Sequence, residues 1–128
     1  MKLSEYFENA KGKGVLATSD STGNVNVAVY ARPHFMDEET VAFIMAERRS
    51  HENLKSNPHA AYLFMEHGDK FVGKRLILTR LGEEKNSELI DTLRRSRHYI
   101  PHDEYYKENK YLVTFRIEKV LPLIGSGE

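Results

Sequence analysis

The chain of 128 residues contains no cysteine and has no net charge, because 19 lysines and arginines balance 19 aspartates and glutamates. The lack of cysteine excludes disulfides, thiol catalysis and thiolate metal sites. The balanced charge disfavours nucleic acid, since a general binder of polyanions carries a clear basic excess. The first residues contain no long apolar run, which disfavours a secretory signal and a membrane helix. We therefore expect a cytoplasmic protein with neither nucleic acid nor membrane as a partner.

Several catalytic signatures are also missing from the sequence. Neither Gly-x-Gly-x-x-Gly nor a Walker loop occurs, which disfavours a Rossmann dinucleotide site and P-loop chemistry. No Gly-x-Ser-x-Gly elbow occurs, so nucleophilic catalysis has little support. His98 and His102 have the spacing of one helix face, but Pro101 between them breaks a regular helix. We therefore expect no metal site.

Short apolar or alternating runs separated by turns dominate the chain. Val25, Val27 and Val29 alternate with other residues, which is the period of a strand with two different faces. The sequence predicts strands at 15–19, 25–30, 41–46, 60–65, 71–81 and 111–117, and helices at 3–10, 50–56 and 83–97. A parallel α/β sheet would need a helix after nearly every strand. We therefore expect one domain, residues 1–128, with a mainly β fold: a closed or nearly closed six-stranded antiparallel barrel with short peripheral helices.

Side chains at the expected helices suggest how these begin and which face is buried. Ser4 is expected to cap the first helix and Ser50 the second. In the third helix, acidic residues lead and arginines trail, which complements the helix dipole. Its inward face is expected to carry Leu89, Ile90 and Leu93.

Two arginines and a serine stand where the second helix is expected to begin. They are Arg48, Arg49 and Ser50, and Asn53 follows in the first turn. A helix N-terminus has unpaired N–H groups and a partial positive charge, so it suits an anion such as phosphate. Guanidinium and hydroxyl groups add donors for the same anion. From the local sequence alone, a solvated, capped helix start explains the pattern, and a phosphate pocket is the functional alternative.

Two strand ends are candidates for a ring-binding cleft. An interrupted strand before Pro33 could offer backbone groups to a flat heterocycle, although an ordinary edge bulge explains the same pattern. The third strand ends beside the candidate phosphate pocket. Its last apolar side chains are expected to belong to the core, and one or two of them could line a ring-binding cleft. The residues concerned are Tyr30, Ala31 and Arg32 in the first segment, and Ile44, Met45 and Ala46 in the second.

The order of these segments resembles a known family. The stretch Glu47 to Pro58, ERRSHENLKSNP, follows an apolar strand and precedes HAAYLFM, and LATSDSTGNVNV supplies an apolar strand with a Gly-bearing turn. Over residues 14–81 and the final strand, the chain is similar to the pyridoxamine 5'-phosphate oxidase-like family of FMN-binding split barrels. The resemblance implies a six-stranded split β-barrel that binds FMN, forms a homodimer and acts as a flavin-dependent oxidoreductase on a small-molecule redox substrate.

The resemblance also assigns roles to residues. In that family the pair before the short helix contacts the FMN phosphate, which corresponds to Arg49 and Ser50, with Asn53 as a further candidate. The strand before Pro33 corresponds to one that approaches the isoalloxazine ring. This implies ring contacts for Tyr30, Ala31 and Arg32, and for Ile44, Met45 and Ala46 along the ring.

Other functions on the same barrel stay open at this point. The chain lacks the long C-terminal region and the Trp-and-Arg substrate motif of the true oxidase, so pyridoxamine phosphate is a poor substrate candidate. A non-enzymatic flavin carrier or electron-transfer module would use the same pocket, and haem or deazaflavin would be another ligand. The segment His98 to Asn109, with its three tyrosines, is expected to cover the flavin or to pack on the surface.

Overall fold

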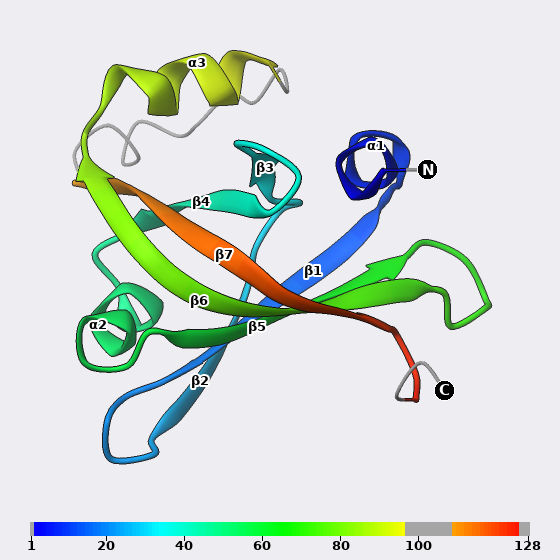
Figure 1. Ribbon diagram of the computed structural model, residues 1–128, viewed down its shortest axis with the longest axis horizontal. Coiled ribbons are helices and arrows are strands. Elements are labelled where there is room, and N and C mark those ends of the chain that lie inside the picture. Colours follow the sequence, from blue (N-terminus) through cyan, green and yellow to red (C-terminus); the bar gives the residue numbers. More distant parts are fainter. Residues whose placement is uncertain (1, 97–108, 126–128) are drawn as a thin grey trace.

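The structure, a computed structural model, describes residues 2–96 and 109–125. In this part of the chain, seven antiparallel strands form one sheet in the order β2-β1-β5-β6-β7-β4-β3, and three short helices flank it (Figure 1). The elements are α1 (Leu3–Asn9), β1 (Gly12–Ser19), β2 (Val25–Val29), β3 (His34–Phe35), β4 (Thr40–Ala46), α2 (Arg49–Ser56), β5 (His59–Glu66), β6 (Gly73–Lys85), α3 (Glu88–Ser96) and β7 (Lys110–Pro122).

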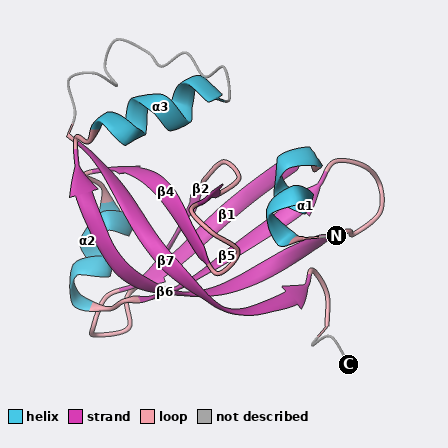
Figure 2. Cartoon of the chain, turned by 45° about the horizontal axis from the view of Figure 1, so that its top comes forward, coloured by secondary structure: helices cyan, strands magenta, loops and turns pink. Residues whose placement is uncertain are grey.

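The connection between the two edge strands shows why the sheet is curled. β2 and β3 are the edges, yet residues 30–33 alone join them. A flat sheet of this many strands would hold its edges about 29 Å apart. The connection spans at most about 18 Å. The sheet therefore curls until its edges approach each other, and β6 and β7 provide the curvature through two register shifts, between Ile77 and Leu78 and between Arg80 and Gly82 (Figure 2).

The mainly β antiparallel barrel predicted from the sequence is confirmed, with one strand more than the six expected. The additional strand is β3, which consists of two residues after Pro33. Its residues His34 and Phe35 pair with Ala42 and Val41 of β4. The short β3 segment carries no alternating pattern that sequence periodicity could reveal, and only its partner strand defines it.

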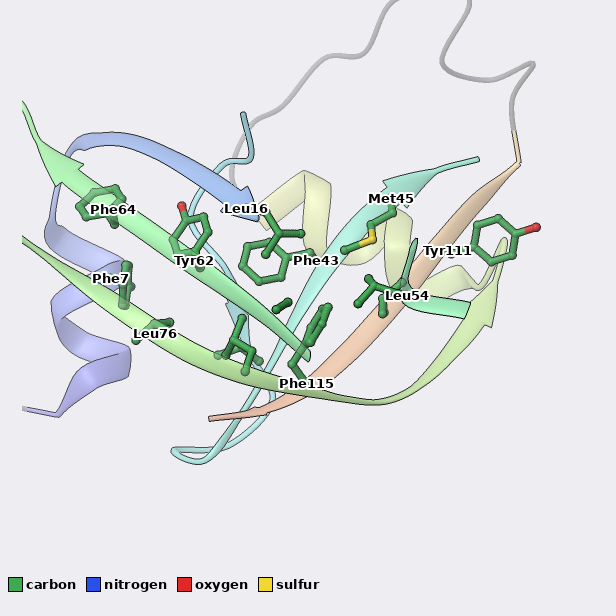
Figure 3. Packing of buried hydrophobic residues seen from close by; sticks show 14 residues of the cluster. Phe7, Leu16, Phe43, Met45, Leu54, Tyr62, Phe64, Leu76, Tyr111 and Phe115 are labelled. Carbon is green, nitrogen blue, oxygen red and sulfur yellow. The ribbon is translucent and has the colours of Figure 1, made fainter. Parts of the chain in front are cut away.

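Aromatic rings from separate elements fill the inside of the curled sheet (Figure 3). The Phe43 ring lies 5.0 Å from the Tyr62 ring and 5.8 Å from the Phe115 ring, measured between centroids. All three residues are buried. A smaller cluster on the other face of β4 joins Ala42 to Ile90 of α3. Alternate residues of β4 therefore serve two cores, as the period of a strand requires.

The third helix begins later than the sequence indicated. β6 continues to Lys85, because Glu83 and Glu84 pair with Val113 and Leu112 of β7, and α3 begins only at Glu88. Local helix propensity is thus outweighed by strand pairing. Within α3, Ile90 is buried as predicted, whereas the prediction for Leu89 is wrong, since its side chain is 38% exposed.

Three further expectations concern the first helix, the long connection and the membrane. Lys2, not Ser4, occupies the N-cap of α1, and the Ser4 hydroxyl donates to the Glu38 carboxylate instead.

His98 and His102 lie outside the described residues, as does the rest of the segment before Asn109. None of the helices within 2–96 and 109–125 is long and apolar enough to cross a membrane.

Candidate functional site

The start of α2 lacks a side-chain cap. Arg48 is the N-cap residue, with an extended backbone (φ −129°, ψ −171°) and no capping hydrogen bond from its side chain. The expectation that Ser50 caps the helix is therefore wrong, because Ser50 lies within the first turn. Arg48 and Arg49 are exposed. The helix start thus has no capping side chain and carries two exposed guanidinium groups, which is a suitable setting for an anion.

Buried polar side chains fix the same helix turn to β1 and β2. Ser50 and Asn53 are only 3% and 6% exposed. Asn26 Nδ2 donates to Ser50 Oγ at 3.3 Å, and Asn53 Nδ2 donates to Thr18 Oγ1 at 3.1 Å. These contacts satisfy polar groups that would otherwise be costly to bury. They hold Ser50 and Asn53 inside the structure, so the exposed side-chain donors at this site are those of Arg48 and Arg49.

Tyr30 joins this cluster through its side chain. Burial raises the pKa of the Tyr30 phenol, while its hydrogen bond with Ser50 and the nearby charge of Arg48 act in the opposite direction. The structure therefore brings Tyr30 next to Ser50 and Arg48, although the sequence analysis treated Tyr30 as part of a separate candidate segment.

The backbone of Tyr30, in contrast, is already engaged within the protein. Its N–H donates to the Gly14 carbonyl at 3.0 Å, and its carbonyl accepts from the Tyr62 hydroxyl at 3.1 Å. A Cβ at Gly14 would lie 1.9 Å from that hydroxyl, so only glycine fits there. The expected backbone contacts to a heterocycle thus have no support at Tyr30, and Ala31 is the exposed residue of this segment.

Arg32 lies at a different place from the start of α2. Its Nη1 donates to the carbonyl oxygens of Phe7 at 2.9 Å and Ala10 at 2.8 Å, at the C-terminal end of α1. A cation at that end complements the helix dipole and pairs with the last carbonyls. In Figures 1 and 2, α1 and α2 lie at opposite ends of the sheet. The structure therefore does not bring Arg32 to the candidate phosphate site.

The end of β4 contributes mainly to packing. Met45 is fully buried in the main core, and Ile44 packs against the small cluster beside α3. Ala46 is half-buried, and its carbonyl accepts from the Arg48 N–H at 2.8 Å. Of these three residues, Ala46 is the one that adjoins the start of α2, and ring contacts of Ile44 and Met45 stay predictions.

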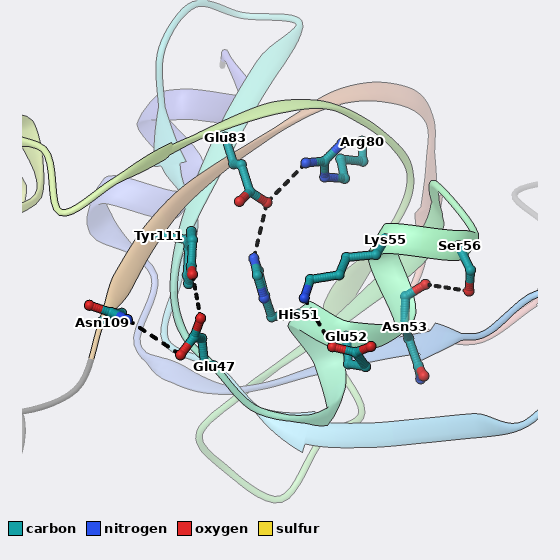
Figure 4. A network of polar contacts seen from close by, with 10 residues as sticks. All are labelled: Glu47, His51, Glu52, Asn53, Lys55, Ser56, Arg80, Glu83, Asn109 and Tyr111. Carbon is teal, nitrogen blue, oxygen red and sulfur yellow. Dashed lines mark hydrogen bonds and ion pairs between the residues drawn. The ribbon is translucent and has the colours of Figure 1, made fainter.

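A polar network on the opposite side of α2 was not anticipated from the sequence (Figure 4). His51 is 2% exposed, and its Nε2 lies 3.0 Å from Glu83 Oε1. Its ring stacks on Tyr111 with 3.9 Å between centroids. The Tyr111 hydroxyl donates to Glu47 Oε1 at 2.5 Å, and this hydrogen bond raises the pKa of Tyr111 to about 12.

One signal in the sequence pointed to the burial of His51. His51 and Leu54 are three residues apart, so they share one face of α2. Leu54 is buried in the main core. The sequence analysis did not use this spacing to predict the burial of His51, and nothing in the local sequence identifies Glu83 and Tyr111 as its partners.

Comparison with known proteins shows the class of fold. No protein-family model and no curated protein sequence matches the chain. Among solved structures, it is similar to an FMN-binding protein from Syntrophomonas wolfei, with a TM-score of 0.78 and 18% identity, over 97% of this chain and 85% of that one. The resemblance to the pyridoxamine 5'-phosphate oxidase-like split barrels is thereby confirmed at the level of the fold.

Two further solved structures have the same fold. A protein named as a candidate pyridoxamine 5'-phosphate oxidase from Lactobacillus delbrueckii gives a TM-score of 0.64 at 18% identity, over 92% of this chain and 88% of that one. An FAD-binding protein from Mesorhizobium loti gives a TM-score of 0.57 at 20% identity, over 91% and 88%. At such identities the similarity establishes the split barrel, and ligands have to be argued from the residues of this chain.

Proposed function

We propose that this protein binds FMN and acts as a flavin-dependent oxidoreductase on a small-molecule substrate. The observation that carries the proposal is the uncapped start of α2, where Arg48 and Arg49 are exposed beside the Tyr30–Ser50 contact. Within the described residues, the Arg49 guanidinium makes no ion pair, so its charge is available to a ligand. Neighbours of the same fold that are named for FMN and FAD support a flavin as that ligand.

The donors at this site fit a phosphate monoester. Arginine presents a planar fork of N–H donors, and the first turn of the helix adds backbone N–H groups and a partial positive charge. Ser50 and Asn53 keep the turn in place through β1 and β2, so the donors are held before the ligand binds. Preorganised donors cost less ordering on binding than mobile ones.

The protein's part in the reaction is binding and orientation. A bound flavin would supply the electron or hydride transfer. Arg48, Arg49 and the first N–H groups of α2 would hold its phosphate, and Tyr30 and Ala46 stand next to this point. We assign no acid or base for a substrate among residues 2–96 and 109–125, so the proposed reaction class follows from the cofactor.

The experiment is a spectroscopic and binding analysis of the purified protein. We expect flavin absorbance at a stoichiometry of one per chain, and much weaker binding of riboflavin, which lacks the phosphate, than of FMN. Equal affinities for the two flavins would refute the phosphate site. The rate at which the flavin-loaded protein oxidises a reduced nicotinamide over many turnovers would separate an oxidoreductase from a flavin carrier. Catalytic turnover supports the oxidoreductase, and its absence supports the carrier.

We further propose a homodimer that uses the exposed face of β2. Val25, Val27 and Val29 are 78%, 68% and 80% exposed on this edge strand. In the sheet register, Val29 lies opposite Val15 and Val27 opposite Ala17, so the valines continue an apolar face on β1. Such a face is unusual on a monomer, and a second copy can cover it without burying charge.

The dimer has its own test. Val27→Lys places a charge in the centre of the valine row and is expected to yield monomers in sedimentation or light scattering. Val120→Lys on β7, where the valine is 45% exposed, is the matched control and should leave the oligomeric state unchanged. A wild-type protein that is monomeric in solution would refute the dimer.

A further inference from the structure

His51 links the candidate phosphate site to the opposite wall of the barrel. Ser50 and Asn53 attach the first turn of α2 to β1 and β2, whereas His51 attaches the same turn to Glu83 of β6 and Tyr111 of β7. Figure 4 shows the imidazole next to both the Glu83 carboxylate and the Tyr111 ring. The start of α2 is thus held from two sides by buried polar side chains.

The length of α2 makes these contacts important for its orientation. The helix has only 8 residues. Isolated helices shorter than about 12–15 residues are marginal in water, so packing determines where such a helix lies. Arg48 and Arg49 directly precede Ser50 and His51 along the chain. Any rotation of the first turn of α2 therefore changes the direction of the two arginines and of the helix N–H groups together.

Glu83 is itself fixed from its other side. Arg80 Nη2 donates to Glu83 Oε1 at 2.9 Å, the same oxygen that His51 contacts. Glu47 accepts a hydrogen bond from the Tyr111 hydroxyl and a second one from Asn109 Nδ2, at 3.4 Å. Each of the two partners of His51 therefore has a fixed position, which a support for a precise binding geometry needs.

We propose that His51 is a positioning residue for the phosphate site. Through its hydrogen bond to Glu83 and its stacking on Tyr111, it sets the direction in which the first turn of α2 presents its donors. The inference rests on the proposed function, since the affected ligand group is the flavin phosphate. Because His51 itself is buried, it would act through the helix turn and not by direct contact with the phosphate.

The two contacts of His51 can be removed separately. His51→Phe keeps a ring to stack on Tyr111 and loses the donor to Glu83. His51→Gln keeps a side-chain N–H that reaches Glu83 and loses the ring. The measured quantity is the ratio of the dissociation constants of riboflavin and FMN, because a loss of positioning weakens only the ligand that carries the phosphate. We expect His51→Phe to lower this ratio by roughly tenfold, and His51→Gln to lower it less.

Controls separate positioning from general stability. His59→Phe, at an exposed histidine of β5, should leave the ratio at its wild-type value. Thermal unfolding of each variant reports stability, and a purely structural role would weaken both flavins equally. An unchanged ratio in both folded His51 variants would overturn this inference and leave the FMN site standing. Equal affinity of the wild type for FMN and riboflavin would overturn the proposed function together with this inference.

Discussion

The helices α1 and α2 lie at opposite ends of the same sheet, and they are buried by different chemistry. In α1 the buried residue is Phe7, whose ring lies 5.3 Å from that of Phe64 and 5.9 Å from that of Phe35. In α2 the buried residues other than Leu54 are polar, namely Ser50, His51 and Asn53.

The difference separates stability from binding. Apolar burial is favourable in itself, whereas a buried polar group stabilises little and is costly when it lacks a partner. Every polar side chain buried in α2 has a hydrogen-bond partner on the sheet. The α1 end therefore contributes stability, and buried polar contacts hold the α2 end in a fixed geometry, which the proposed binding site needs.

The largest effect is expected from removing the apolar anchor of α1. Phe7→Ala should lower the free energy of unfolding by about 3–5 kcal/mol, because it removes a buried ring and leaves a cavity. Chemical denaturation measures this change. The FMN affinity of the folded fraction should stay near the wild-type value, and a large loss of affinity would show that the two ends are not independent.

The next effect concerns the arginine at the α2 end. Arg49→Ala should weaken FMN binding by more than about tenfold, since a charge-assisted contact to phosphate contributes about 1.5–3 kcal/mol. Titration calorimetry with FMN and riboflavin is the measurement, and riboflavin binding should hardly change. Lys55→Ala, at an exposed residue later in the same helix, is the matched control. An unchanged FMN affinity in folded Arg49→Ala would remove this residue from the site.

Arg32 provides the complementary substitution at the α1 end. Arg32→Ala removes the donor to the carbonyls of Phe7 and Ala10 and should lower the free energy of unfolding by about 1–2 kcal/mol. Its effect on FMN affinity should be small. A loss of FMN affinity without a loss of stability would return Arg32 to the cofactor site, where the sequence resemblance had placed it.

The smallest effect is a difference in acid sensitivity between the two ends. Burial of the Glu83 carboxyl raises its pKa, but the contacts with Arg80 and His51 together outweigh burial and leave the pKa below its ordinary value of 4.5. A carboxyl with a lowered pKa contributes stability above pH 4.5, and this contribution is lost as the pH falls through the folded-state value.

The pH dependence of unfolding in Glu83→Gln measures this contribution. The variant should lose less stability than the wild type when the pH is lowered below 4.5. Phe7→Ala removes no titrating group, so its stability should run parallel to that of the wild type over the same range. A Glu83→Gln curve parallel to the wild type would show that the α2 end is no more sensitive to acid than the rest of the molecule.

The sequence predicted the barrel better than its details. Strand periods, turns and the scarcity of helices indicated the antiparallel barrel, which the structure and its solved neighbours confirm. The extension of β6 over Glu83 and Glu84 was missed, because these residues favour a helix locally and only pairing with β7 makes them a strand. The segment before Asn109 lies outside the described residues, so its predicted role stays a prediction.

For the candidate site, the sequence determined which residue types stand together along the chain. Arg48, Arg49 and Ser50 are adjacent, so their presence at one helix start follows from local order alone. Tertiary structure decided what faces that helix, because Tyr30 and Glu83 lie far from it in sequence. It also placed the Arg32 guanidinium at the C-terminal end of α1, only two residues after Tyr30, because the carbonyl oxygens of Phe7 and Ala10 lie within its reach.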